Sequence, residues 1–135
     1  MSRLEAFLAN AKAGHIEFES TIETIDSLFR VTPCAFSIGK EPDMVKNTAG
    51  TNVGSLRIFA FAKMLGLDEQ TTLHLFGRHY RDVLDNPHGD AHANIRHFMR
   101  YGWAGVNIAG EPLKALDPAL IASVKHELAN PLRPL

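Results

Sequence analysis

Histidine and arginine side chains gather in one part of this chain, and both residue types suit chemistry on an anionic ligand. Five of the seven histidines and four arginines fall in a stretch that contains no lysine: His74, Arg78, His79, Arg81, His88, His92, Arg96, His97 and Arg100. Arginine presents a planar fork to carboxylate or phosphate groups, and histidine titrates near neutral pH. The alternative is an ordinary solvated surface in which aspartates of the same stretch pair with these charges.

A second candidate region is the small, polar and glycine-rich segment from Asn47 to Ser55, which runs directly into an apolar stretch. The first N–H groups of a helix are free and lie at the positive end of its dipole, so a helix that begins here suits an anion. No Gly-Lys-Ser/Thr follows and no βαβ unit surrounds the segment, which excludes a Walker loop and a dinucleotide fingerprint. The alternative is that Asn52 or Ser55 only caps the helix while the glycines form turns.

His88, Asp90 and His92 are close in sequence and are candidate metal ligands. His88 lies in a turn flanked by proline and glycine, so it does not share a helical face with His92. No recognised ligand spacing is present. We therefore expect no metal and no other cofactor.

Composition limits the class of protein. The chain has 135 residues, 45% of them hydrophobic, and a net charge of -1, which favours one globular domain and argues against nucleic-acid or membrane-surface binding. The longest strictly apolar run, residues 58–62, is far shorter than the ~20 residues of a membrane span. We expect no signal peptide, and the single cysteine, Cys34, fits a reducing compartment. These features together predict a cytoplasmic protein without nucleic-acid or membrane partners, and the bacterial origin is implied only by the family resemblance described below.

Apolar spacing and capping residues predict the elements that must position these side chains. The fold class is mainly α (α+β): a compact single domain over residues 1–135 with a small two-stranded β element. About six helices are expected, over residues 2–14, 17–29, 56–65, 68–86, 90–102 and 118–129. A strand over 31–38 should pair through residues 34–38 with a second strand over 106–109, and residues 39–54 form a long loop. The helix over 56–65 is apolar almost all round, so it belongs at the centre of the core.

Several short motifs occur in an order that resembles the HopJ family, small proteins named as type III effectors from plant-pathogenic bacteria. They include Thr32-Pro33-x-Ala35-Phe36, Asn47-x-Ala49-Gly50-x-Asn52-x-Gly54-Ser55, Tyr80-Arg81-Asp82-Val83-Leu84 and Asn94-Ile95-Arg96-x-Phe98-Met99. The resemblance covers residues 16–114 and points to the same two regions, 47–55 and 78–96. It implies secretion into a host cell if the family name describes function. Ala91-His92 departs from the family pattern, in which Asp-His is common.

Our leading hypothesis is a module that binds a small anionic ligand, or a host partner, in a polar cleft between the 47–55 loop and the following helices. Arg81 and Arg96 would hold the anion and His92 would make the site sensitive to pH. The predicted ligand-binding residues are Asn47, Asn52, Ser55, Tyr80, Arg81, His92, Asn94 and Arg96.

Two alternatives belong to other classes. An enzyme would use His92 as acid and base with Asp90 as the residue that orients it. A host-interaction protein would instead present an aromatic patch around Phe98, Tyr101 and Trp103 to its partner.

Overall fold

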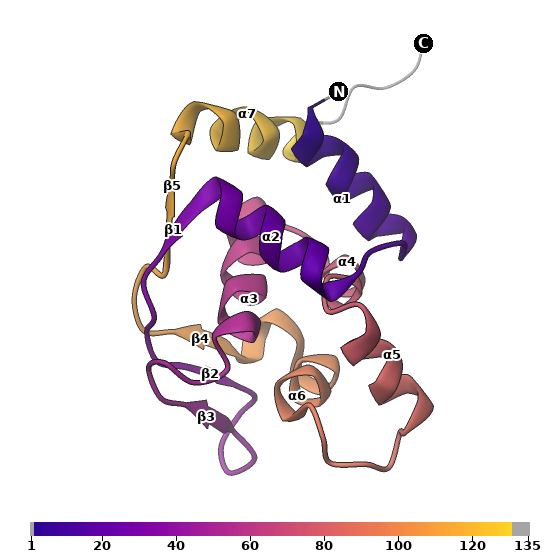
Figure 1. Ribbon diagram of the computed structural model, residues 1–135. Coiled ribbons are helices and arrows are strands. Elements are labelled where there is room, and N and C mark those ends of the chain that lie inside the picture. Colours follow the sequence, from indigo (N-terminus) through magenta and orange to yellow (C-terminus); the bar gives the residue numbers. More distant parts are fainter. Residues whose placement is uncertain (1, 131–135) are drawn as a thin grey trace.

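The computed structural model describes residues 2–130, and its helices pack around one long apolar helix, α3 (Val53–Leu65) (Figure 1). Seven α-helices occur in the described residues: α1 (Arg3–Ala13), α2 (Phe18–Leu28), α3, α4 (Glu69–His74), α5 (Arg78–Asp85), α6 (Ala93–Tyr101) and α7 (Pro118–Ala129), with a 3-10 turn, η1, at Gly102–Gly105. Helix α3 contacts α2, α4 and α7. No helix in residues 2–130 has the length and apolar character needed to cross a membrane.

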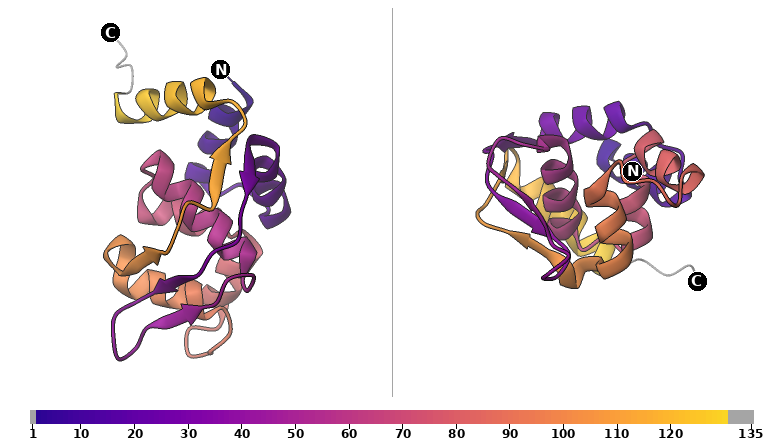
Figure 2. Two further views of the ribbon diagram at one scale, coloured as in Figure 1. Left: turned by 90° about the vertical axis from the view of Figure 1, so that its left-hand side faces the viewer. Right: turned by 90° about the horizontal axis from the view of Figure 1, so that it is seen from below.

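Five short strands form two small antiparallel sheets rather than the single two-stranded element predicted (Figure 2). They are β1 (Phe29–Val31), β2 (Phe36–Ile38), β3 (Val45–Asn47), β4 (Val106–Ile108) and β5 (Leu113–Ala115), in the orders β1-β5 and β3-β2-β4. The predicted pairing of residues 34–38 with the strand over 106–109 is confirmed, since β2 pairs with β4 and Phe36 lies opposite Ile108. The predicted strand over 31–38 is interrupted around Pro33, which lacks the N–H that a sheet ladder needs.

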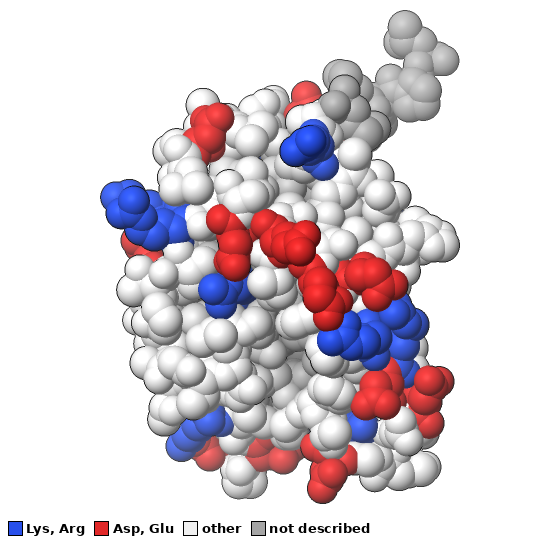
Figure 3. All heavy atoms as spheres, in the orientation of Figure 1, with Lys and Arg blue, Asp and Glu red and all other residues white. Residues whose placement is uncertain are grey.

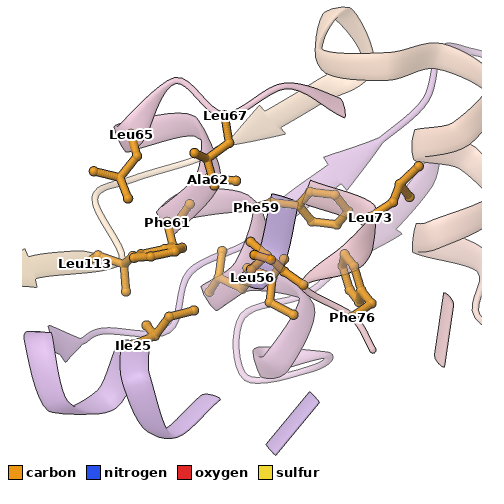
Figure 4. Close-up of a cluster of buried hydrophobic side chains, with 14 of the residues drawn as sticks. Ile25, Leu56, Phe59, Phe61, Ala62, Leu65, Leu67, Leu73, Phe76 and Leu113 are labelled. Atoms are coloured by element: carbon orange, nitrogen blue, oxygen red, sulfur yellow. The ribbon is translucent and has the colours of Figure 1, made fainter. Parts of the chain in front are cut away.

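The core confirms the central place predicted for the apolar helix. Phe59 and Phe61 of α3 are fully buried, and Figure 4 shows them among side chains from several other elements. The ring of Phe59 lies 5.3 Å from that of Phe76 and 5.0 Å from that of Phe98, between centroids. Burying such side chains stabilises the fold by about 1.5–3 kcal/mol each, so α3 is the platform on which the other helices rest.

Local sequence signals set both outer helices as predicted. Ser2 and Glu5 form a capping box at the start of α1, and Gly14 ends it in the left-handed conformation with φ 84°. Asp117 caps α7 by accepting from the N–H of Leu120, with Pro118 in the first turn.

The predicted helix over 68–86 is instead two helices, α4 and α5, separated at Gly77. Gly77 has φ +56°, and a Cβ there would lie 2.6 Å from the backbone nitrogen of Phe18. The close approach of the start of α2 therefore forces a glycine and a change of direction at this point. The break redirects α5 against α6. It places His79 and Asp82 beside the start of α6.

The start of α6 also differs from its prediction. Asp90 does not cap the helix; His92 occupies the N-cap position, with φ 61° and ψ 50°. Residues 86–92 form an irregular link between α5 and α6, which brings the ring of His92 next to α5.

Candidate functional site

A hollow of about 490 Å³ lies where the first turns of α3 and α6 approach α5. Helix α3 contributes Gly54 and Ser55 with its N-cap Asn52, and α6 contributes Ala93 and Asn94 with its N-cap His92. Concave sites with several convergent polar groups are where small ligands bind most often.

Both helix starts at this hollow share a rare backbone geometry. Asn52 has φ 48° and His92 has φ 61°, and they are the two non-glycine residues with positive φ in the described part of the chain. Neither side chain caps its helix. The first-turn N–H groups of α3 and α6 therefore lack the acceptor that a capping side chain supplies. The positive ends of two helix dipoles meet at one hollow, which favours an anionic group there.

Three asparagines join these helix starts to β3. The side chains of Asn47 and Asn94 donate to each other at 3.0 and 3.1 Å, and Asn52 donates to Oδ1 of Asn47 at 2.7 Å. Asn47 also donates to the carbonyl of Phe36 at 3.3 Å. Asn47 and Asn94 are buried, so these bonds satisfy amides that would otherwise be costly to bury. The network holds the starts of α3 and α6 in a fixed relation.

Two imidazoles form one wall of the hollow. The rings of His79 and His92 lie 5.1 Å apart between centroids, and His79 also meets the ring of Phe18 edge to face at 4.6 Å. Burial, followed by the positive charge of nearby Arg78, lowers the pKa of His79 below its ordinary value. Nε2 of His92 lies 3.0 Å from Oδ2 of Asp82. Because an ionised carboxylate only accepts, Nε2 of His92 carries the proton of this bond.

Five of the predicted ligand-binding and catalytic residues meet at this hollow. Asn52, Ser55, His92 and Asn94 line it, as does Asp90 from the 86–92 link. Asn47, the next predicted ligand-binding residue, lies behind this lining and contacts it only through the asparagine network.

The two arginines predicted to hold an anion do not line the hollow. Nε of Arg96 donates to the carbonyl of Ala91 at 2.6 Å and its NH1 group donates to that of Pro87 at 3.4 Å, so its guanidinium binds the 86–92 link. Arg81 lines a neighbouring hollow of about 430 Å³, which shares His79 and His92 with the first, and its NH2 group lies 3.6 Å from Glu17.

Acidic side chains of α2 and the preceding residue explain why the arginines of α5 face outward. Figure 3 shows Asp and Glu side chains crossing the face formed by α2, next to Lys and Arg side chains over α5. Arg78 pairs with Glu19, and Arg81 pairs with Glu17. Tyr80 also lies away from the hollow, because its hydroxyl accepts from Gln70 at 3.3 Å.

The residue predicted to orient His92 is corrected from Asp90 to Asp82. Asp82 is ten residues before His92, and its other carboxylate oxygen accepts from Nδ2 of Asn86 at 3.1 Å. Within residues 2–130, no group of three or more His, Cys, Asp or Glu side chains could hold a metal ion.

The aromatic patch proposed for a partner is not an exposed apolar surface. Phe98 is buried, and Trp103 packs edge to face against it at 5.1 Å while its Nε1 donates to the carbonyl of Leu67. The hydroxyl of Tyr101 donates to Asp43 at 3.1 Å. Cys34 is half-buried between β1 and β2.

Sequence reasoning missed His79 and Asp82 as functional partners of His92, and it missed the apolar walls formed by Phe18 and Phe76. His79 and Asp82 are three residues apart, so they share one polar face of α5. This spacing could have indicated from the sequence that both side chains meet the same neighbour.

The chain matches known proteins in two comparisons. The sequence profile of a family described as HopJ type III effector protein matches residues 4–113. The crystal structure of a protein of unknown function, VPA0580, is similar with 40% sequence identity and a TM-score of 0.78, over 84% of this chain and 94% of that one. A search of the curated proteins found no match.

Proposed function

This chain belongs to the HopJ type III effector family, and we propose that it acts by binding a small ligand with one anionic group in the hollow between α3, α5 and α6. The observation that carries this proposal is the convergence of two helix starts and two imidazoles on one concave site. A perturbed histidine among convergent polar groups is typical of functional sites.

The charges at the hollow define what it would accept. Each helix start contributes up to about 2 kcal/mol of interaction with an anion when it is partly buried. No lysine or arginine is among the lining residues, and Asp90 lies at the wall. A carboxylate or a singly charged phosphate ester therefore fits better than a polyphosphate, because a second or third negative charge would face Asp90 without a compensating cation.

The test is a thermal-stabilisation screen with small carboxylates and phosphate esters. Ser55→Glu places a carboxylate at the first turn of α3, where it competes with the ligand, so the stabilisation of the wild type should be lost. The matched control is Ala119→Glu, which adds the same charge to the exposed first turn of α7, away from the hollow. Equal stabilisation of both variants by the same compounds would contradict the proposal.

A second candidate is acid–base catalysis by His92, favoured by its contact with Asp82 at 3.0 Å. A metabolite-pool assay that compares the wild type with His92→Ala would test it. Identical turnover profiles would count against catalysis.

Delivery into a host cell is part of the proposal and rests on the description of the family. A translocation reporter fused to this chain should give signal inside host cells from a bacterium with a working type III system. A strain without that system should give none, and equal signals from both strains would contradict delivery.

A further inference from the structure

The imidazole pair at the hollow can carry one positive charge more easily than two. The rings of His79 and His92 lie 5.1 Å apart between centroids, so two imidazolium charges would repel each other at close range. An anion bound in the hollow favours one imidazolium beside it. The first question is which of the two rings would carry that charge.

Neighbouring charges select His92. Oδ2 of Asp82 lies 3.0 Å from Nε2 of His92, and Asn86 holds the other carboxylate oxygen, so this acceptor is kept in place. His79 instead follows Arg78 in the chain and lies edge to face against Phe18. Burial and the Arg78 charge both lower the pKa of His79. The carboxylate that can accept from an imidazolium at hydrogen-bond distance therefore lies at His92 and not at His79.

Two carboxylates, Glu19 of α2 and Asp82, raise the pKa of His79, but burial, Arg78 and His92 lower it by more. The other charged groups lie on the walls of the two hollows. Asp90 lines the hollow from the 86–92 link, and Arg81 and Asp85 line the neighbouring hollow from α5. Helix α3 and strand β3 place Val45, Asn52, Gly54 and Ser55 at the hollow, none of which titrates in the neutral range.

The backbone keeps His92 beside the bound anion. His92 is the N-cap of α6 in a left-handed conformation, directly before the first-turn N–H groups of that helix. Arg96 bonds to the carbonyl of Ala91 at 2.6 Å, which holds the residue before His92. The second ring nitrogen, Nδ1, has no hydrogen-bond partner among residues 2–130 and is open to accept a proton.

We infer that binding of an anion in the hollow is coupled to the uptake of one proton by His92, and that Asp82 selects His92 over His79 for this proton. The inference rests on the proposed function, because it names the proton linkage of that same site. Nδ1 of His92 takes a proton from water, and the resulting imidazolium donates from Nε2 to Asp82 while its charge favours the anion.

Acetate is the probe, since it carries the single negative charge that suits the hollow and does not titrate between pH 6 and pH 8, so any proton taken up goes to the protein. Amide shifts of Ser55 and Ala93 are followed by NMR during titration with sodium acetate, against sodium chloride at equal ionic strength. If one proton is taken up with each anion, the affinity for acetate falls by about tenfold per unit rise in pH where the unbound ring is neutral. Long-range ¹H–¹⁵N spectra check that neutral His92 carries its proton on Nε2.

Three variants assign the linkage. His92→Asn keeps a residue that tolerates the left-handed backbone, and the pH dependence should be lost. Asp82→Asn should move the pH dependence to lower pH while the ring is kept, because the carboxylate that favours the imidazolium is gone. His79→Gln should keep it, and the remote control His126→Gln on α7 should match the wild type in both affinity and pH dependence.

The outcomes separate this inference from the proposed function. If acetate leaves the Ser55 and Ala93 amides unshifted at every pH, the anion site itself is overturned. If acetate shifts them with an affinity that does not change with pH, only the proton linkage is overturned. If His79→Gln rather than His92→Asn removes the pH dependence, the selection by Asp82 is wrong.

Discussion

Asn47 and Asn94 exchange two side-chain hydrogen bonds, at 3.0 and 3.1 Å, although 47 residues separate them in the sequence. Both amides are buried, and Asn52 adds a third bond to the same oxygen of Asn47. The bonds link the last residue of β3 to the first turn of α6 and to the N-cap of α3. The relative position of the two helix starts thus depends on one small set of amide groups.

Asn47→Ala and Asn94→Ala should each destabilise the fold by about 1–3 kcal/mol, because each change leaves a buried amide without its partner. The double variant should cost less than the sum, since no buried amide is left without its partner and the exposed Asn52 can bond to water. Urea unfolding of the four proteins in the cycle measures this coupling. Asn10→Ala on the exposed face of α1 is the control and should stay near the wild type. Additive single costs would show that the amide pair is not coupled.

Arg96→Lys distinguishes a loop-holding role from a ligand-binding role. Lysine keeps the charge but cannot reproduce the bonds of the guanidinium to the carbonyls of Ala91 and Pro87. We expect residues 88–91 to gain motion on the nanosecond timescale in ¹⁵N relaxation, together with a weaker response to anions. Arg30→Lys in β1 is the matched control. If the motion of residues 88–91 and the binding of anions both stay as in the wild type, Arg96 does not have the role assigned to it.

Local chemistry explains the parts of the fold that sequence predicts well. The capping box of Ser2 and Glu5 and the Asp117-Pro118 start act within a few residues, so their helices begin where expected. The apolar composition of α3 likewise requires burial on all sides, whatever surrounds it.

Contacts between distant segments explain the parts that sequence does not predict. The sequence around Gly77 fits a continuous helix, and only the contact with the backbone of Phe18 in the folded protein shows why glycine is needed there. Arginine near a glycine-rich loop suggests an anion ligand, but Arg96 satisfies carbonyls of the preceding link instead. The pairing of His92 with Asp82 depends on how the 86–92 link turns α6 back against α5. Asp90 was the predicted partner because it is closer to His92 in the sequence.

Gly77→Ala should destabilise the protein by about 3 kcal/mol or more. At φ 56° and ψ −126° an alanine is strained by about 1–3 kcal/mol, and the new Cβ would also lie 2.6 Å from the backbone nitrogen of Phe18. Gly66→Ala is a comparison without the close contact, because Gly66 is left-handed with φ +70° but its Cβ would meet no atom within 4 Å. That variant should lose only the roughly 1–2 kcal/mol of a left-handed alanine. Equal urea midpoints for the two variants would show that the approach of α2 does not require glycine at position 77.

Stability should fall as the pH decreases below about 6.5, and His79 should account for part of the loss. Its pKa in the folded protein is lowered from the ordinary value of 6.5 by burial and then by Arg78, so the unfolded chain binds a proton more readily. This stability is fully present above pH 6.5, and it is lost as the pH falls from 6.5 towards the folded pKa. Urea midpoints at pH 7.5 and pH 5.5 measure the loss, which should be smaller in His79→Gln than in the wild type or His126→Gln. A loss of the same size in all three proteins would mean that His79 does not carry it.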